Sequence, residues 1–334
     1  MKEEEIRPKN LFAEYITLAK KDAGDYFSSV QFLPVPCPAC GSPESARAFE
    51  KTGFTYVECQ ECGTLYVNPR PRADAFARYY SEAPSIRFWA THFYKQTEES
   101  RRNLLIRPKA QLVYNKIQQY FGTVQDRSCI LDIGGGYGVF CEELQTIYGK
   151  KPEIVAIEPS PELYEICRDK GIRTINKFFE DVTRPDIGTE SIVAATCFEL
   201  AEHLQDPGTF FSHCSSVLDP NSLLIVTTLN WHGFDLQMLQ EQSKSIQPPA
   251  HINFFTQGSI TKLLTRCGFE IFEVSTPGKL DVDIVSKQLE DVRCEFFRKM
   301  IEEGDEFVKQ EFQTFLQKSR FSSHMMIIAR NVMR

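Results

Sequence analysis

Residues 129–140 read CILDIGGGYGVF, an apolar run that ends in an acid and then breaks into alternating glycines. This pattern predicts a buried strand that leads into a tight turn and the first residues of a helix. Glycine adopts positive φ and has no Cβ, so backbone N–H groups in such a turn approach a bound nucleotide closely. The spacing is DxGxGxG. A dinucleotide fingerprint needs GxGxxG or GxGxxA, but Val139 stands at the required third position and the third glycine is Gly138.

A second acid follows at the distance that a nucleotide site requires. Residues 142–148 have a helical pattern, and the next apolar run, 154–157, ends in Glu158. A carboxylate at the tip of this second strand accepts hydrogen bonds from both hydroxyls of a ribose. The alternative is that Glu158 merely caps the turn Pro159-Ser160-Pro161.

The glycine motif with Asp132 resembles motif I of the class I methyltransferases that depend on S-adenosylmethionine (SAM). Glu158 resembles the ribose acid of the same family. The resemblance implies SAM as cofactor and places Asp181 at the adenine-side acid, with Phe179 near the ring; alternatively, both residues only cap or pack. Tyr137 either touches the methionine part of SAM or shields the turn. The expected cofactor-binding residues are Asp132, Gly134, Gly136, Tyr137, Gly138, Glu158, Pro159, Phe179, Asp181 and Phe198.

The remaining core alternates between apolar runs and helical stretches, which predicts a doubly wound α/β fold with a mostly parallel, Rossmann-like sheet of seven strands. The predicted strands are 129–133, 154–158, 172–176, 191–197, 222–229, 269–275 and 324–330. The methyltransferase domain should occupy residues 128–334, with a helical insertion at about 280–320. Residues 198–207 and 249–256 add to the resemblance, because they look like the family's segments after the fourth strand and before the sixth.

Methyl transfer to a hydroxyl or a carbon acid needs a general base, and histidine is the natural base near neutral pH. We expect His251 first, because it follows a Pro-Pro break beside the site, and His203 second, because it follows the fourth strand. His232 is a third candidate. In related proteins the Glu-His pair after strand four often holds the loop and helix together, so a structural role for His203 is the alternative.

Two CxxC pairs stand at the front of the chain. Cys37 and Cys40 are separated from Cys59 and Cys62 by eighteen residues between the inner cysteines, which is the spacing of a zinc ribbon. Four thiolates leave no open position on Zn²⁺, so the predicted site is structural; a redox pair would need only one CxxC in a βαβ context. This front resembles bacterial methyltransferases with an amino-terminal zinc-binding module, several of which act on sugars or cell-surface glycans.

The regions around these modules have helical patterns. We expect a helical arm over 1–32, the zinc ribbon over 33–71 with a hairpin around its second knuckle, and a helical linker or cap over 72–127 that lies above the cofactor. The cap carries four basic residues that either bind a phosphorylated substrate or form a solvated helix face. They are Arg101, Arg102, Arg107 and Lys109.

Net charge and hydropathy limit the classes of partner that the protein is expected to bind. The net charge of −7 argues against bulk nucleic acid, and no long apolar stretch or signal sequence is found, so we expect a cytoplasmic protein without membrane insertion. The expected acceptor is a small molecule, a nucleotide sugar or surface-glycan precursor. The insertion either covers this substrate or forms the surface of a homodimer. The alternatives are a zinc-ribbon methyltransferase that modifies RNA or protein, and a non-catalytic SAM-binding module.

Overall fold

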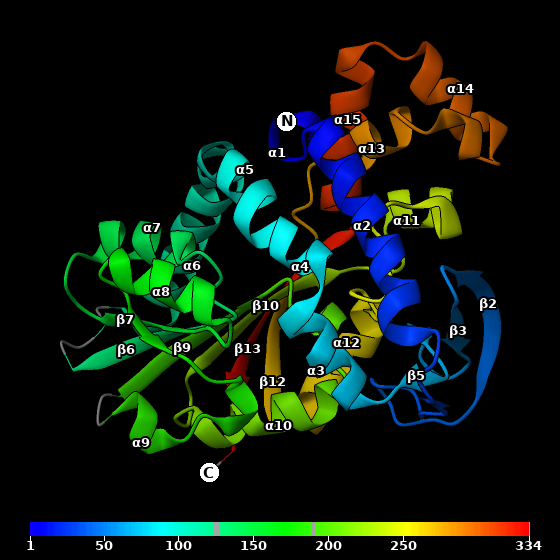
Figure 1. Ribbon diagram of the computed structural model, residues 1–334. Coiled ribbons are helices and arrows are strands. Elements are labelled where there is room, and N and C mark those ends of the chain that lie inside the picture. The colour runs from blue at the N-terminus through cyan, green and yellow to red at the C-terminus, as the bar shows by residue number, and fades with distance from the viewer. Residues whose placement is uncertain (123, 125–126, 189–190, 334) are drawn as a thin grey trace.

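A seven-stranded sheet forms the centre of the protein in the computed structural model, which describes residues 1–122, 124, 127–188 and 191–333 (Figure 1). The strand order is β12-β13-β10-β9-β6-β7-β8, and β13 runs antiparallel to both of its neighbours while the other neighbours are parallel. The strands are β6 (Ser128–Ile133), β7 (Glu153–Ile157), β8 (Arg173–Ile175), β9 (Ser191–Phe198), β10 (Leu223–Leu229), β12 (Phe269–Ser275) and β13 (His324–Asn331). All seven predicted strands are confirmed, each within one residue of its predicted ends.

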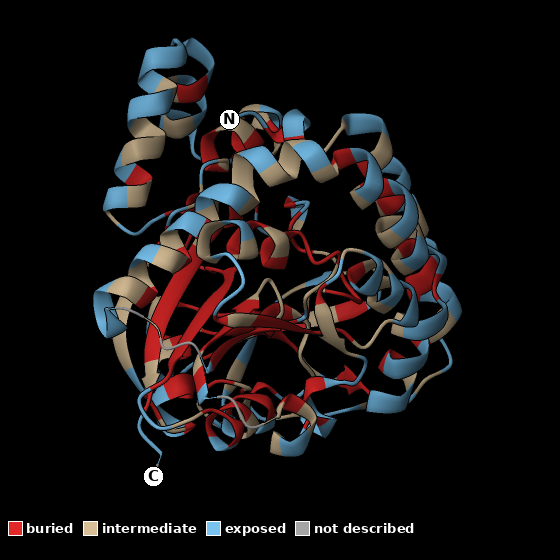
Figure 2. Cartoon of the chain, turned by 90° about the vertical axis from the view of Figure 1, so that its left-hand side faces the viewer, coloured by how far each residue is buried: buried red, intermediate tan, exposed pale blue. Residues whose placement is uncertain are grey.

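Helices cover both faces of this sheet, as the doubly wound prediction requires. Ile130 faces a layer made by α6 (Arg107–Phe121), α7 (Val139–Tyr148) and α8 (Pro161–Asp169). Its neighbour Leu131 faces the opposite layer, which contains α10 (Pro207–Val217) and α12 (Gln257–Arg266). Figure 2 shows the buried strands between these partly exposed helices. The strand order reverses between β6 and β9, and ligands of such sheets bind beyond the carboxyl ends at that point.

A second, four-stranded sheet joins the front of the chain to its later part. Its order is β11-β4-β3-β2, and β11 pairs with β4 through Asn253 opposite Tyr66 and Phe254 opposite Leu65. The strands are β2 (Ser45–Lys51), β3 (Phe54–Cys59), β4 (Leu65–Val67) and β11 (Asn253–Phe254), while β1 (Phe32–Leu33) pairs separately with β5 (Arg70–Pro71). The predicted hairpin is therefore present, and a strand from far along the chain extends it.

The arm and the cap pack on each other. Tyr15 lies 4.8 Å from Trp89 and Phe12 lies 6.1 Å from Phe93, measured between ring centroids. The helices are α1 (Glu3–Ile6), α2 (Lys9–Phe27), α3 (Ala73–Glu82), α4 (Pro84–Phe88) and α5 (Tyr94–Arg101), with π-helical turns at Trp89–Phe93 and Arg102–Ile106. Within the described part of the chain, no helix is both long enough and apolar enough to cross a bilayer.

The helical insertion before β13 is present and projects from the body of the molecule (Figure 1). Its helices are α13 (Asp281–Ser286), α14 (Glu295–Glu303) and α15 (Glu306–Lys318), which pack on α11 (Phe234–Leu239). Phe297 and Phe312 contact Phe234 edge-on, as packing residues do. Phe296, Phe307 and Phe315 are exposed instead, because two short helices have too little interior to bury five rings.

Short helical turns complete the described secondary structure. A single α-helical turn, α9, lies at Arg184–Ile187. The 3₁₀ turns are Phe179–Asp181, Ala201–His203, Gln240–Gln242 and Leu289–Asp291.

Candidate active site and four-cysteine cluster

The glycine turn, residues 134–138, connects β6 to α7 with positive φ at three glycines. The values are +78° at Gly134, +53° at Gly136 and +70° at Gly138. A Cβ at Gly138 would lie 2.4 Å from Cδ1 of Ile172, so no other residue fits there without movement. A Cβ at Gly136 would meet nothing closer than 4.0 Å, which leaves that side of the turn open. The turn therefore has the backbone that a nucleotide site needs.

Both predicted acids lie beside this turn. Oε2 of Glu158 accepts a hydrogen bond from the N–H of Gly136 at 2.8 Å, and Oε1 accepts one from the N–H of Ser160 at 2.9 Å. Burial raises the pKa of Glu158 to about 7. Asp132 is buried and accepts a hydrogen bond from Oγ1 of Thr196 at 2.7 Å. Glu158 thus caps its own turn and also reaches the glycine turn, so the two interpretations of this residue are compatible.

The other expected cofactor residues divide into accessible and packed ones. Asp181 is exposed and Pro159 is half-buried. Phe198 is half-buried and contacts Phe140 edge-on at 4.9 Å. Phe179 is only 3% exposed and lies 5.4 Å from the ring of Phe210, so in this conformation it is a core residue. A contact between Phe179 and an adenine stays a prediction.

The cap lies against the glycine turn. Tyr94 of α5 stacks on Tyr137 at 4.3 Å between ring centroids. Arg102 forms ion pairs with Glu142 and Glu143 of α7, at 2.6 Å and 2.9 Å. Neither proposed role of the cap arginines describes Arg102, because its charge is used to hold the cap to the helix that follows the turn. The stacking of Tyr94 could not be inferred from the sequence, since it joins residues of two separate segments.

His203 and His251 lie together, with their ring centroids 4.8 Å apart. Nδ1 of His203 is 3.0 Å from the carbonyl oxygen of Ala250, and Nδ1 of His251 is 2.6 Å from that of Ser245. Burial lowers the pKa of His203 to about 4; burial and then the charge of His203 lower the pKa of His251 to about 3. Both rings are therefore neutral at pH 7.

Glu202 lies beside the two histidines, whereas His232, the third candidate base, lies elsewhere. The ligand-type atoms of Glu202, His203 and His251 lie within 4.8 Å of one another, but Oε2 of Glu202 already accepts a hydrogen bond from Thr228 at 2.8 Å. His232 is exposed, and its Nε2 would lie 3.7 Å from a Cβ at Gly63. The third candidate base therefore stands beside the second cysteine knuckle.

Four polar side chains that the sequence prediction did not group form what we call the strand-end cluster: Lys109, Glu199, Thr227 and His324. Oε1 of Glu199 accepts a hydrogen bond from Oγ1 of Thr227 at 2.7 Å and lies 3.7 Å from Nζ of Lys109. Oε2 of Glu199 lies 3.3 Å from Nδ1 of His324. These residues lie on α6, directly after β9, on β10 and at the start of β13, so only the folded sheet brings them together.

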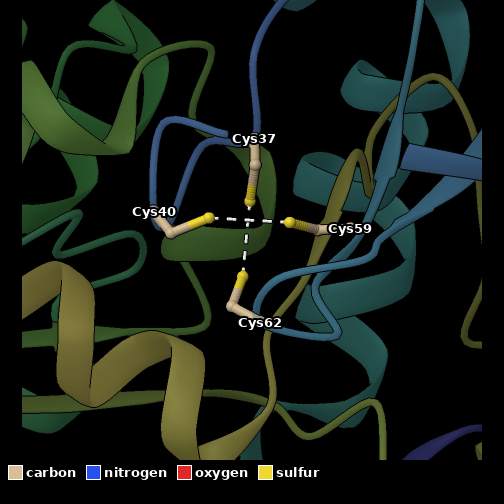
Figure 3. A group of neighbouring side chains, drawn as sticks. All are labelled: Cys37, Cys40, Cys59 and Cys62. Carbon is tan, nitrogen blue, oxygen red and sulfur yellow. Dashed lines mark hydrogen bonds between the residues drawn. The ribbon is translucent and has the colours of Figure 1, made fainter. Parts of the chain in front are cut away.

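The four predicted zinc ligands converge in the cysteine cluster of Figure 3: Cys37, Cys40, Cys59 and Cys62. Their sulfur atoms all lie within 4.8 Å of one another, and two of the S···S distances are 3.5 Å. A tetrahedron of Zn–S bonds of about 2.3 Å has edges of about 3.8 Å, so the arrangement fits Zn²⁺. All four are free cysteines in the structure. The donor set is closed and provides no position for a substrate.

A glycine turn after β6, an acid at the end of β6, a second acid directly after β7, and seven strands in this order define the α/β class of nucleotide-binding methyltransferase folds. Residues 101–274, more than half of the chain, match the model of the methyltransferase domain family, and the chain belongs to that family.

The relatives agree with this assignment. A ubiquinone biosynthesis O-methyltransferase of Bradyrhizobium diazoefficiens is 30% identical over 115 residues, which are 33% of this chain and 44% of that protein. The protein of the same name from Xanthomonas axonopodis pv. citri is 31% identical over 107 residues, 30% of this chain and 43% of its own length. The match thus spans less than half of the length of these curated relatives.

A solved structure shows the same fold. The plantazolicin methyltransferase BpumL, in complex with a pentazolic desmethylPZN analog and SAH, superimposes with a TM-score of 0.50 and 14% identity. The alignment covers 77% of this chain and 95% of BpumL.

Proposed function

We propose that this protein transfers a methyl group from SAM to a small-molecule acceptor. The observation that carries the proposal is the buried carboxylate of Glu158, which follows β7 and reaches the N–H of Gly136 in the glycine turn. A carboxylate in this place is suited to both hydroxyls of a ribose. The O-methyltransferase names of the curated relatives support the same reaction class.

Each proposed residue has a distinct role in holding the cofactor. Glu158 binds the ribose, and the glycine turn approaches the methionine part with its backbone. Asp132 is held by Thr196 and orders the end of β6 below the turn. For the adenine side we propose Asp181 and Phe179, and for the side of the sulfur Tyr137 and Phe198. Bound SAM supplies a methyl group that is already electrophilic, so the protein's part is positioning and removal of the acceptor's proton.

For the acceptor we retain a nucleotide sugar or surface-glycan precursor as the finer proposal. It rests on the resemblance of the amino-terminal module alone, and the curated relatives are named for ubiquinone biosynthesis instead. A screen for methyl transfer should therefore include nucleotide sugars, polyprenylated or simple phenols, and tRNA as separate pools. Turnover with tRNA alone would overturn the small-molecule proposal.

The four-stranded sheet argues against the macromolecular alternative. Its basic residues already have partners within the protein: Arg47 pairs with Glu50, and Lys51 donates to the carbonyl of Ser243. Arg70 of the neighbouring β5 is buried. A surface that binds nucleic acid needs accessible cations grouped on one face. We therefore propose that the cysteine cluster binds Zn²⁺ as a structural element of the fold.

Calorimetric titration with SAM and S-adenosylhomocysteine (SAH) tests the cofactor proposal. We expect Glu158→Ala to weaken SAH binding by about 1.5 to 3 kcal/mol, because a charged acceptor of two hydrogen bonds is removed. Glu162→Ala is the matched control, since Glu162 is an exposed acid on the neighbouring α8. Unchanged affinity of the Glu158 variant, or tighter binding of NADH than of SAH by the native protein, would contradict the proposal.

A further inference from the structure

The strand-end cluster lies at the edge of the sheet where a ligand is expected. β13 runs antiparallel to β10, and its first residue, His324, pairs with Leu229, the last residue of β10. Glu199 follows β9 directly and lies at the same edge. The amino end of an antiparallel strand is thus placed among the carboxyl ends of the parallel strands. His324 therefore reaches the ligand edge although it lies far along the chain from the glycine turn.

The backbone at Glu199 adds a second observation. Its φ is +49°, a left-handed conformation that a residue with a long side chain adopts at a cost of about 1 kcal/mol or more. The N–H of Glu199 donates to the carbonyl oxygen of Thr227 at 2.9 Å, which holds this conformation in place. The chain therefore turns its carboxylate toward His324 at some energetic cost. Such local strain occurs preferentially at functional sites.

The side chains of His324 and Glu199 are both accessible to a ligand. The side chain of His324 is 40% exposed and that of Glu199 is 37% exposed. The contact uses Nδ1 of His324, so the proton on Nδ1 points at the carboxylate and Nε2 is left with its lone pair. A neutral imidazole held in this tautomer is arranged to accept a proton at Nε2.

The charges around His324 adjust its basicity. Partial removal of the ring from solvent lowers the pKa of His324, and the carboxylate of Glu199 raises it by more, so that the net change is upward. Arg7 and Lys109 oppose this rise. Glu202 and Asp235 also interact with the imidazolium, but burial dominates at both carboxyls and raises their pKa values to about 8 and about 7. Burial acts to raise the pKa of Glu199, but the charges of His324 and Lys109 outweigh it, so Glu199 is ionised at neutral pH.

We propose that His324 is the general base of the methyl transfer and that Glu199 is the positioning residue that orients its ring. The proposal rests on the proposed function of this site. The acceptor loses one proton to Nε2 of His324 and gains the methyl group, while the electron pair of the broken C–S bond remains on sulfur. The proton then passes from His324 to solvent.

This assignment differs from the expectation based on the sequence, which favoured His251 and His203. A general base works best when its pKa is near the operating pH. The pKa values of about 3 and about 4 make His251 and His203 poor proton acceptors at neutral pH, although both remain suited to hydrogen bonding. His324 has a carboxylate partner and a raised pKa, and neither of the other two rings has both.

The first test measures His324 without any acceptor. The full chain with ¹³C- and ¹⁵N-labelled histidine is titrated by NMR, both free and in its SAH complex, and the His324 signal is assigned by its loss in His324→Asn. We expect the Nδ1–H tautomer in the neutral form and a lower pKa of His324 in Glu199→Gln. His92→Asn, which removes an exposed ring, should leave the His324 signals unchanged. An Nε2–H tautomer, or a pKa that does not respond to Glu199→Gln, overturns the proposal.

The second test uses the acceptor identified by the screen described above. We expect His324→Asn and His324→Gln to lower kcat by about 100-fold or more, the usual contribution of a general base, while SAH affinity stays unchanged. In the native protein kcat should rise with pH through the pKa of His324, and Glu199→Gln should move that rise to lower pH. Native kcat in both His324 variants overturns the proposal. Failure of SAH to bind the native protein would instead overturn the proposed function, and the NMR result on the SAH-free chain would still decide the pairing of His324 with Glu199.

Discussion

The glycine turn of the large sheet and the two cysteine knuckles of the small sheet are both tight loops with glycines at positive φ, but different forces hold them. Gly138 is packed against Ile172 and Cys167, which belong to the apolar core. Gly41 and Gly63 follow the knuckles at φ of +80° and +69°. β2, which follows the first knuckle, has no fully buried residue, whereas β4, which follows the second, is fully buried. A large core fixes the first loop, whereas the second depends on its sulfur ligands and on contacts with the rest of the chain.

The largest expected effect comes from removing a sulfur ligand. Cys59→Ser should abolish stoichiometric zinc and lower the free energy of unfolding by more than about 4 kcal/mol, because loss of a structural metal is among the most destabilising changes. Zinc content is measured by atomic emission and stability by urea denaturation. Cys294→Ser, which changes an exposed cysteine outside the cluster, should alter neither quantity.

The opposite result would change the comparison between the two loops. If Cys59→Ser loses its zinc but keeps its stability, then packing against the large sheet supports the knuckles and the metal does not. Cys37, Cys59 and Tyr66 do share a core cluster with residues of β6 and β9, so such support has a structural basis.

An intermediate effect is expected at Arg70, which joins the small sheet to the large domain. Its guanidinium donates to the carbonyl oxygens of Val67 and Gln205, at 3.0 Å and 2.7 Å, and to Oδ1 of Asn253. Arg70→Met fills similar space but leaves three acceptors, two of them buried, without this donor, so we expect a loss of about 3 kcal/mol in the free energy of unfolding.

Arg72→Met is the matched control for Arg70. Arg72 is exposed and pairs with the exposed Asp74, so its replacement should change stability by less than about 0.5 kcal/mol. Equal effects of the two variants in urea denaturation would mean that Arg70 does not hold the sheets together. The zinc content of Arg70→Met should remain that of the native protein, which separates this contribution from that of the cysteines.

The sequence predicted those parts of the molecule that depend on local patterns. The seven strands followed from apolar runs between helical stretches, and the convergence of four cysteines followed from the spacing of two CxxC pairs. The local sequence is enough for such predictions, because a strand, a turn or a knuckle is formed by residues that are neighbours in the chain.

The features that the sequence did not predict depend on contacts between segments far apart in the chain. β11 is two residues long and carries Asn253, so neither length nor apolarity marked it as the strand that completes the small sheet. The pairing of Glu199 with His324 joins the end of one strand to the start of another, far along the chain. The burial that depresses the pKa values of His203 and His251 is likewise a property of the fold and has no signature in the motif around either residue.

The smallest expected effect is a pH dependence that should separate the two loops. Burial raises the pKa of Glu158 to about 7, so below that pH its carboxyl is increasingly protonated and offers one acceptor fewer to the ribose. SAH affinity should therefore fall as the pH is lowered from about 8 to about 6, by at most about tenfold per pH unit. Calorimetric titration across this range measures the change, and Glu158→Ala should have a weaker affinity that no longer varies with pH.

Zinc content over the same range provides the contrast with the cysteine knuckles. It should stay constant, because the metal itself holds its thiolate ligands in the deprotonated form. A parallel loss of zinc and of SAH affinity would mean that one titration governs both loops and that they are not held independently. Constant zinc with falling SAH affinity would instead assign the titration to the glycine turn and its buried acid, as the contact between Glu158 and Gly136 leads us to expect.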